Sequence, residues 1–266
     1  MPKVSVVMPV FNTAKFLPEA IESILNQTFK DFEFVIIDDG STDESRQIIQ
    51  AYADKDARIK AYQNKQNMWI SYTRNRLINL TKTNFIAPQD SDDVSLPHRL
   101  EKEFNFLSTN PQYAVVSGDI IIIDEDWKEI WYRKYRDQID KTILKKSPIA
   151  QSASMFDKQA FLKVWWYDDN LCCWEDYDLW LRLYTQWYKI KNLNDFLIKY
   201  RIRSGQSKTQ VKKALKTTIN IQKKAFTQYG LKPSISDKVF RYIENLLFFL
   251  PDRIILELFK KLEYRK

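Results

Sequence analysis

Residues 84–93 read NFIAPQDSDD, an apolar run that passes directly into three carboxylates, Asp90, Asp92 and Asp93. The run predicts a buried β-strand, and the acidic residues follow where that strand breaks into a loop. Ionised carboxylates crowded at the end of a buried strand repel one another and lose solvation, so they need a cation beside them. Oxygen ligands suit Mg²⁺ or Mn²⁺, which commonly completes its coordination with water and substrate phosphates. The stretch therefore indicates a metal-bound diphosphate, although the tetrapeptide taken alone also fits a solvated acidic turn.

Short β-branched runs alternate with amphipathic stretches through the first half of the chain, as in β-α-β units around a mainly parallel sheet. Expected strands cover residues 4–10, 32–37, 59–63 and 84–89, and expected helices cover 18–26, the stretch from a Thr42 or Asp43 cap to Ala53, and 72–80. In open α/β sheets, ligands bind beyond the carboxyl ends of the strands. Asn12, Asp38, Asp39 and the acidic cluster all follow strands, so the sequence predicts that they share one site.

The second half is less regular. It predicts helices over residues 97–110 and 175–184, strands over 130–135 and 151–156, and a long strand over 113–124 that is interrupted at residues 117–119. Repeats and low-complexity linkers are absent from the sequence, which favours one domain over residues 1–205 with a helical C-terminal extension over residues 206–266.

Composition narrows the function classes. Only 4 of 266 residues are glycine, so Gly-rich phosphate loops of the dinucleotide or Walker type are not expected. Cys172 and Cys173 are adjacent and match neither a disulfide framework nor a zinc site, which favours a reducing compartment. The single histidine, His98, argues against a Ser-His or Cys-His hydrolase and reads as a surface or capping residue. Without a signal-peptide pattern or a stretch of about 18–20 apolar residues, a cytoplasmic location is expected.

The net charge of +8 is concentrated in one segment, because residues 199–224 contain nine basic side chains and no acidic one. No recognition helix or RNA-stacking motif accompanies them, so no nucleic-acid partner is expected. An anionic membrane surface or a phosphorylated substrate explains the segment. The last residues, 251–266, predict an amphipathic helix with a basic rim. That pattern fits a helix lying on a membrane equally well as one packed against residues 239–250 and the body of the protein.

Four segments follow one another in a fixed order: VSVVMPVFN at 4–12, FEFVIIDDGSTDES at 32–45, Arg74-Asn75 followed by DSDD at 90–93, and WEDYDLWLRL at 174–183. In this order and spacing they resemble the family 2 glycosyltransferases, inverting enzymes with the nucleotide-sugar transferase (GT-A) fold. The resemblance covers roughly residues 3–203. It implies an α/β fold of GT-A type with a mainly parallel central sheet flanked by helices, in which residues 1–110 bind the nucleotide-sugar and residues 111–205 form the acceptor half.

The resemblance also implies site residues. The nucleotide-sugar would lie against Pro9, Phe11, Asn12, Asp38, Asp39, Arg74 and Asp92. By the same analogy Asp93 is the direct ligand of a Mn²⁺ or Mg²⁺ cofactor, with Asp92 touching the ribose or the metal. Asp176 is the general base, while Glu175, Trp166 and Arg203 lie on the acceptor side or support it.

The chemistry agrees with these roles. A metal bridging the two phosphates stabilises the charge that develops on the leaving nucleotide. A carboxylate on the opposite face of the sugar takes the proton of the attacking acceptor hydroxyl, so a single displacement inverts the anomeric centre.

The chain departs from the family pattern in three places. Arg203 stands where the family often has histidine, and an arginine can clamp a phosphate but cannot be a neutral metal ligand. Trp165-Trp166-Tyr167 replaces a common Gly-Gly-Tyr turn, which suggests a stacking platform for a sugar beside the more frequent use of tryptophan in core packing. Residues 67–71, NMWIS, replace a Gly-rich stretch before Arg74.

The sequence therefore predicts a metal-dependent inverting glycosyltransferase. It would move a sugar from a nucleotide-sugar, most simply a UDP-sugar, to a hydroxyl of a glycan or lipid-linked acceptor in surface polysaccharide synthesis. The basic segment and the terminal helix would hold it at the inner face of the cell membrane, and a loop within residues 204–209 would close over the donor phosphates. A nucleotidyltransferase and a non-catalytic glycan- or membrane-binding module stay open as alternatives. The oligomeric state is not predicted.

Overall fold

The computed structural model describes residues 1–137, 139, 141–171, 173–203 and 211–263, and for residues 141, 256 and 259–263 it describes the backbone alone. The predicted closing loop within residues 204–209 lies outside these ranges. So do Cys172, Lys208, Arg265 and Lys266, and the side chains of residues 259–262 that were expected on the terminal helix.

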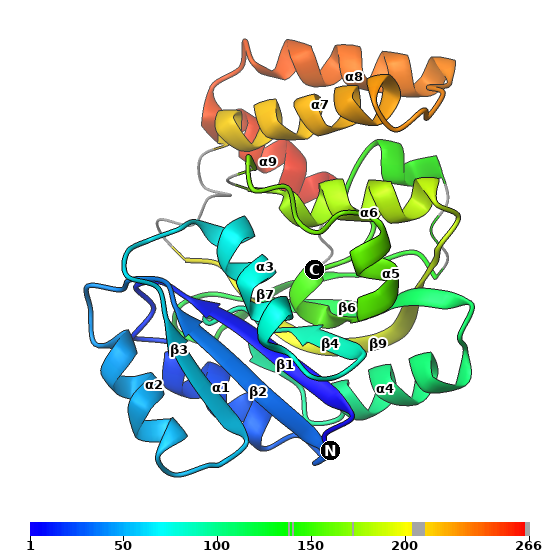
Figure 1. Cartoon of the computed structure of the whole chain (residues 1–266). Helices are drawn as coiled ribbons and strands as arrows, with labels where there is room; N and C mark the ends of the chain where they lie inside the picture. Colours follow the sequence, from blue (N-terminus) through cyan, green and yellow to red (C-terminus); the bar gives the residue numbers. More distant parts are fainter. Residues whose placement is uncertain (138, 140, 172, 204–210, 264–266) are drawn as a thin grey trace.

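Within the described residues, nine strands form one mixed sheet in the order β3-β2-β1-β4-β8-β6-β9-β5, with β7 paired to β6 (Figure 1). The strands are β1 Val4–Val10, β2 Phe32–Asp38, β3 Ile59–Gln63, β4 Phe85–Pro88, β5 Val94–Ser95, β6 Tyr113–Ile123, β7 Glu129–Arg133, β8 Ser154–Asp157 and β9 Lys189–Arg201. The helices are α1 Leu17–Leu25, α2 Ser45–Ala53, α3 Ile70–Leu80, α4 Arg99–Thr109, α5 Lys158–Lys163, α6 Glu175–Thr185, α7 Val211–Thr227, α8 Ile235–Leu247 and α9 Asp252–Glu263, with 3₁₀ turns η1 Lys141–Leu144 and η2 Gln151–Ala153.

The first half of the sheet is parallel, as predicted. β1 lies between β2 and β4 and pairs in parallel with both, and β3 extends the sheet beyond β2. Every residue of β1 and β2 is buried, as their continuous apolar runs require when both faces of a sheet are covered. The loops that follow β1, β2 and β4 consequently leave the sheet at the same edge.

Side-chain alternation along β1 assigns the helices to two faces. Val4, Val6 and Met8 pack with the apolar residues of α1, α2 and α4, and Val7 packs on the other face with those of α3, α5 and α6. The central sheet is therefore flanked by helices on both sides, as the sequence predicted.

The second half of the sheet is mixed, and it differs from the prediction. β8 runs antiparallel between β4 and β6, and the predicted strand 151–156 begins as the 3₁₀ turn η2. β6 is continuous where an interruption was expected. Its register against β9 shifts instead on both sides of Asp119, next to Gly118, where an added Cβ would lie 2.3 Å from Leu197 Cγ.

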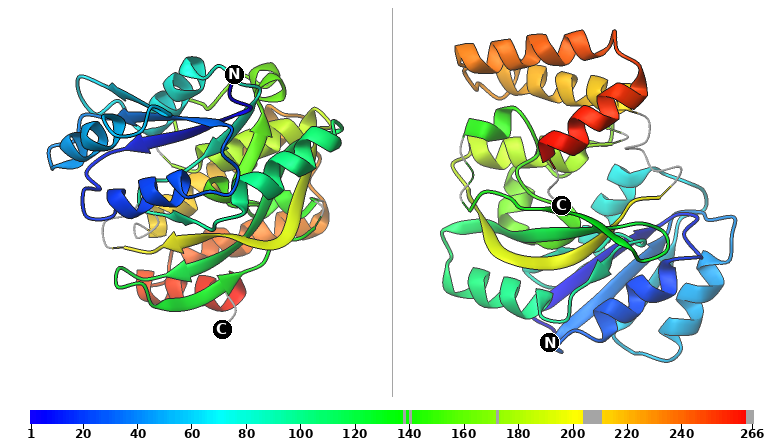
Figure 2. Two further views of the ribbon diagram at one scale, coloured as in Figure 1. Left: turned by 90° about the horizontal axis from the view of Figure 1, so that it is seen from below. Right: turned by 180° about the vertical axis from the view of Figure 1, so that it is seen from behind.

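β9 was not predicted. It pairs in parallel with β6 and, near its end, antiparallel with β5, where Val94 faces Lys199. The strand bends along its length, so the sheet curls away from the plane of β1 and β2 (Figure 2). This curl brings Arg201 and the residues after it beside the acidic loop between β4 and β5.

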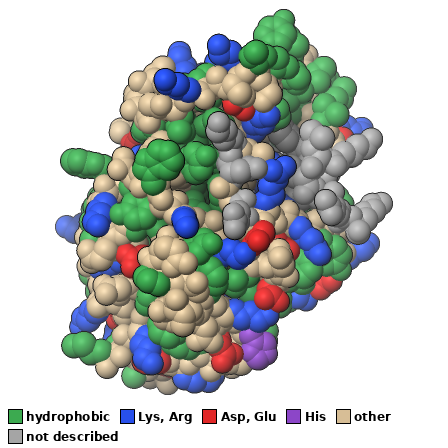
Figure 3. Space-filling view, turned by 90° about the vertical axis from the view of Figure 1, so that its right-hand side faces the viewer, with side chains coloured by type: hydrophobic (Ala, Val, Ile, Leu, Met, Phe, Trp, Pro, Cys, Tyr) green, Lys and Arg blue, Asp and Glu red, His purple; other side chains and the backbone are tan. Residues whose placement is uncertain are grey.

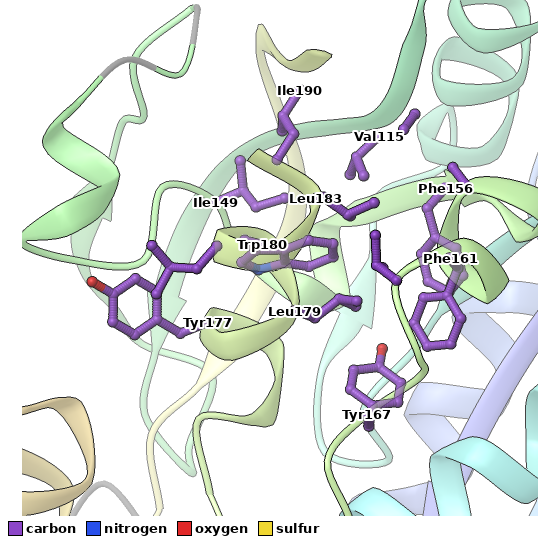
Figure 4. Close-up of a cluster of buried hydrophobic side chains, with 14 of the residues drawn as sticks. Val115, Ile149, Phe156, Phe161, Tyr167, Tyr177, Leu179, Trp180, Leu183 and Ile190 are labelled. Atoms are coloured by element: carbon purple, nitrogen blue, oxygen red, sulfur yellow. The ribbon is translucent and has the colours of Figure 1, made fainter. Parts of the chain in front are cut away.

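Helix α6 contributes Tyr177, Leu179, Trp180 and Leu183 to a buried cluster with Phe156 and Phe161 (Figure 4). The C-terminal extension joins this cluster, because Ile221 and Ala225 of α7 are buried in it. α9 packs on α7 and buries Ile255. α8 and α9 therefore both pack on α7, and α7 packs against α6, at the end of the molecule away from the N-terminus (Figure 1).

Candidate active site

A cavity of about 460 Å³ opens at the carboxyl ends of β1 and β4. It brings together the loop after β4 and the first turn of α6, which are more than 80 residues apart in the sequence. Eight of the predicted site residues line it: Pro9, Phe11, Asp39, Arg74, Asp92, Glu175, Asp176 and Arg203. The acidic loop and the predicted general base therefore face one shared space.

Asp93 lies beneath this cavity and is not part of its lining. Its side chain is fully buried, Oδ1 accepts a hydrogen bond from the backbone N–H of Arg201 at 2.9 Å, and Oδ2 accepts one from Ser152 Oγ at 2.7 Å. Burial, followed by the charges of Asp92 and Asp90, raises the pKa of Asp93 well above its ordinary value. In this structure the carboxyl group of Asp93 fixes β9 and η2 under the acidic loop, and its role as the direct ligand of a cation stays a prediction.

Asp90 and Asp92 line the cavity instead, and each has a guanidinium beside it. Arg74 Nη2 donates to Asp90 Oδ1 at 2.8 Å, and Arg203 Nε donates to Asp92 Oδ2 at 2.6 Å. The two cations offset the repulsion between neighbouring carboxylates. Arg203, which replaces the family's usual histidine, thus lies against the acidic loop at the cavity wall.

The donor set fits a hard divalent ion that is only partly held by protein. Asp90 and Asp92 supply carboxylate oxygens, the ligand type that Mg²⁺ and Mn²⁺ prefer. Over the described part of the chain, no group of three or more His, Cys, Asp or Glu side chains is placed to hold a metal ion. An ion at this place would take its remaining ligands from a diphosphate and from water.

Arg74 of α3 connects the acidic loop to α6. Besides Asp90, it donates to Gln151 Oε1 at 3.1 Å and to Glu175 Oε1. Burial raises the pKa of Glu175 to about 7, although Arg74 lowers it, and the charge of Asp176 raises it further. Glu175 therefore acts in this structure as a buried partner of Arg74.

Asp176 stands in the first turn of α6 and is half-buried at the cavity wall. Its Oδ1 accepts a hydrogen bond from the backbone N–H of Tyr177 at 2.8 Å. The positive end of the helix dipole favours an ionised carboxylate at such a position. An anionic Asp176 beside the cavity is equipped to accept a proton.

The residues predicted for the nucleotide side divide into two groups. Asp39 lines the cavity, and its Oδ1 accepts hydrogen bonds from Asn64 Nδ2 at 2.5 Å and from the backbone N–H of Met68 at 3.0 Å. Asp38 and Asn12 do not line it. Asp38 Oδ1 accepts from the backbone N–H of Ser41, and Asn12 Oδ1 accepts from that of Thr42, so both residues shape the loop after β2.

Trp166 does not line the cavity and packs against the buried cluster, which is the alternative that the sequence analysis kept beside a sugar platform. Its ring packs edge-on against Phe161 with centroids 6.1 Å apart, and its carbonyl accepts from Arg182. The sequence analysis missed several residues of the cavity wall, among them Trp69, Trp174, Tyr135, Tyr200, Gln151 and Ser152. The polar pair Gln151-Ser152, which interrupts an otherwise apolar strand pattern, was the available signal.

Comparison with known proteins identifies the family. The family model described as Glycosyl transferase family 2 matches residues 5–165. The chain belongs to this family. It is 38% identical over 206 residues to an uncharacterized glycosyltransferase of Methanocaldococcus jannaschii, covering 76% of this chain and 71% of the relative. It is 36% identical over 206 residues to the O-antigen biosynthesis glycosyltransferase WbnJ of Escherichia coli, covering 76% of this chain and 80% of WbnJ.

The solved structures agree on the fold. Staphylococcus aureus TarS 1–349 in complex with UDP-GlcNAc superposes with a TM-score of 0.65 at 20% identity, covering 82% of this chain and 66% of that one. TarS in complex with UDP gives a TM-score of 0.63, and the chain covers 65% of that structure. This family 2 glycosyltransferase therefore has the GT-A architecture that the sequence predicted.

Proposed function

We propose that this glycosyltransferase moves a sugar from a UDP-sugar to a hydroxyl of a glycan or lipid-linked acceptor, with inversion, during synthesis of a surface polysaccharide. The observation that carries the proposal is the single cavity shared by Asp90 and Asp92 on one side and Asp176 on the other. The UDP-GlcNAc complex of TarS supports the choice of donor, and the O-antigen role in the name of WbnJ supports the choice of product.

On the donor side, Asp92 and Asp90 would hold the cofactor, Mn²⁺ or Mg²⁺. When bound, the ion stabilises the negative charge that develops on the departing diphosphate. Asp93 keeps the loop in place through its hydrogen bonds to Arg201 and Ser152. Arg203 binds phosphate oxygens, since a guanidinium suits them and lies at the loop already.

On the acceptor side, Asp176 accepts the proton of the acceptor hydroxyl as its oxygen attacks the anomeric carbon. The new carbon–oxygen bond forms while the bond from that carbon to the phosphate oxygen breaks, and the electron pair leaves with UDP. One displacement of this kind inverts the anomeric centre and needs no covalent protein nucleophile. Glu175 and Arg74 hold the first turn of α6 in position.

Thermal unfolding with a panel of nucleotide-sugars tests this function. A UDP-sugar at about 100 times its Kd, with Mn²⁺ present, is expected to raise Tm by about 5–10 °C, because a ligand that binds only the folded state stabilises it. The shift should shrink when Mn²⁺ is left out and be absent with a CMP-sugar. Equal shifts with every nucleotide-sugar, or none with any, would argue against a UDP-sugar transferase and for the open alternative of a binding module.

We further propose that the C-terminal helices hold the enzyme at an anionic membrane surface. None of the helices in the described ranges is both long and apolar enough to cross a membrane. α8 turns its acidic residues Asp237 and Glu244 inward, where they are buried, and exposes an apolar stripe. The stripe consists of Ile235, Val239, Tyr242, Ile243, Leu246 and Phe249, and Phe249 is 85% exposed.

This stripe replaces the terminal helix as the main candidate for the surface that contacts the membrane. Hydrophobic side chains gather at the top of the molecule, over the layer of α7 and α8 (Figure 3). In α9, Ile255 is buried, whereas Ile254 and Leu258 remain 47% and 39% exposed. The exposed cations Lys232, before α8, and Lys238, within it, complement anionic headgroups.

The triple variant Ile243→Asn, Leu246→Asn, Phe249→Ser is expected to reduce binding to vesicles that contain phosphatidylglycerol by at least about tenfold, because it removes apolar side chains from the interface. Vesicle sedimentation measures the change. Tyr72→Ser, which removes an exposed aromatic ring from α3, is the matched control and should bind as the parent does. Unchanged binding of the triple variant, or loss of a dimer in its place, would overturn the membrane proposal.

A further inference from the structure

The backbone is left-handed at six of the eight tryptophans, all of which the structure describes. The φ angles are 68° at Trp69, 68° at Trp127, 72° at Trp165, 61° at Trp166, 61° at Trp174 and 62° at Trp187. Among the other described non-glycine residues, only Asn12 has a positive φ. This region is sterically unfavourable for a bulky L-residue and is the ordinary region of glycine.

Two of these tryptophans end helices in the manner of glycine. Trp187 follows Gln186, the C-cap of α6. Its N–H donates to the carbonyl of Tyr184, and the N–H of Tyr188 donates to that of Leu183. This pair of bonds is the Schellman motif, in which the residue at the place of Trp187 is usually glycine. Trp165 occupies the equivalent place after α5, with its N–H donating to Leu162.

Two others stand in turns that favour glycine. Trp127 closes the tight turn between β6 and β7, where its N–H donates to the carbonyl of Asp124, and the left-handed position of such a hairpin is typically glycine. Trp69 precedes α3 with φ 68° and ψ 160°. That combination belongs to a region that is essentially restricted to glycine.

At three of the six positions, burial of the indole ring does not offset this strain. Trp69 is 65% exposed, Trp165 is 85% exposed and Trp187 is 92% exposed, so these large apolar rings lie mostly in solvent. Of the two tryptophans with ordinary backbone angles, Trp180 is fully buried and Trp131 is partly buried against the cluster that contains Ile120. Trp166 and Trp174 are partly buried against another cluster, so the backbone angle, and not burial alone, distinguishes the six tryptophans from these two.

We infer that the protein made in its own cell carries glycine at positions 69, 127, 165, 166, 174 and 187. One cause accounts for all six positions. The codon UGA is a stop signal in the standard genetic code, and variant codes read it as tryptophan or as glycine. Suppose that the codon is UGA at these six positions and UGG at Trp131 and Trp180. Reading UGA as tryptophan then gives the present sequence, and reading it as glycine gives a chain whose residues suit the left-handed backbone at the six positions.

Composition points the same way. The sequence has 4 glycines in 266 residues, far below the average usage of about 7%, and 8 tryptophans. Two of the three departures from the family pattern, at Trp165-Trp166 and in the stretch that contains Trp69, coincide with these positions. Replacing six tryptophans by glycine would move both counts toward ordinary values.

The inference changes the active site, and this consequence rests on the proposed function. Trp69 and Trp174 both line the cavity, and Trp174 directly precedes Glu175 and Asp176. Glycine at these positions removes two indole rings from the cavity wall and lets a ligand approach the backbone N–H groups. The working pocket is therefore wider than the tryptophan-containing one, and Trp69→Gly with Trp174→Gly should lower the KM for the nucleotide-sugar.

Sequencing peptides of the protein purified from its own cells, by tandem mass spectrometry, is the direct test. Glycine is expected at the six positions and tryptophan at 131 and 180, with UGA and UGG as the corresponding codons in the gene. Tryptophan at the six positions in native peptides, or UGG codons there, would overturn the inference. This readout does not depend on catalysis, so it stands apart from any failure of the proposed function.

Recombinant protein provides a second test. The chain with all six Trp→Gly substitutions should melt at least about 10 °C above the chain with six tryptophans, because each left-handed non-glycine residue stores strain. Trp131→Gly and Trp180→Gly are the matched controls and should lower Tm, since these rings are packed. A sixfold variant that melts at or below the parent would contradict the inference.

Discussion

Asp176→Asn is expected to reduce sugar transfer by about 10²–10⁴-fold while UDP-sugar binding stays unchanged. The amide has nearly the shape of the carboxylate and can still accept the hydrogen bond from the backbone N–H of Tyr177. It cannot, however, take a proton from the acceptor hydroxyl. Initial rates of transfer and donor-induced Tm shifts, measured on the same preparation, separate the two effects.

The control for this variant is Asp54→Asn, an exposed carboxylate at the end of α2 that accepts a hydrogen bond from Gln50 and does not line the cavity. It should retain full activity. Glu175→Gln is informative beside it, because Glu175 is buried against Arg74 and does not need to exchange a proton in the proposed mechanism. Near-normal turnover of Asp176→Asn would move the role of general base to another residue.

The strands of the first half were predictable because their signal is local. β1, β2 and β3 are continuous or β-branched runs, and their observed bounds agree with the prediction to within one residue. β9 carried no such signal. Its sequence, KIKNLNDFLIKYR, mixes lysine and asparagine with apolar residues because its burial varies along a strand that bends. Long-range pairing with β6 decides its conformation, and a single sequence does not display that pairing.

In the site, too, the features set by neighbouring residues were predictable and those set by distant contacts were not. The sequence located the acidic loop at the end of a strand and the pair Glu175-Asp176 at the start of a helix. It did not show which of the adjacent carboxylates turns toward the cavity. That choice depends on the backbone N–H of Arg201, which lies 108 residues beyond Asp93 in the chain.

The tryptophans differ from expectation in a third way, because the residue type does not suit the backbone conformation at its position. The sequence analysis offered a sugar platform beside core packing for Trp166, and from the shortage of glycine it expected no Gly-rich phosphate loop of the dinucleotide or Walker type. The φ angles show left-handed backbone, the ordinary region of glycine, at positions 69, 127, 165, 166, 174 and 187. Local rules are normally broken at functional sites, whereas here they are broken also at the exposed helix ends Trp165 and Trp187, which do not line the cavity. The left-handed backbone at these tryptophans therefore points to a different residue type at these positions rather than to strain that serves catalysis.

Asp92→Asn is expected to remove the Mn²⁺-dependent part of UDP-sugar affinity and to reduce transfer by at least about 10²-fold. The substitution replaces an anionic oxygen ligand by a neutral one and leaves Arg203 without its carboxylate partner. Isothermal titration of UDP in the presence and absence of Mn²⁺ measures the loss. The variant should unfold at a temperature close to that of the parent, because Asp92 is hydrogen-bonded at the cavity wall rather than in the core.

Asp93→Asn distinguishes the proposal that Asp92 holds the metal ion from the family pattern, which implies that Asp93 is the direct metal ligand. Asp93 is fully buried between Arg201 and Ser152, and its raised pKa means that burial already disfavours its charged form. A neutral amide of the same shape can keep a hydrogen bond with each neighbour, so the Mn²⁺ dependence of UDP binding should survive. If Asp93→Asn abolished that dependence while Asp92→Asn preserved it, Asp93 would be the metal ligand, and the acidic loop would have to turn over to present it to the cavity.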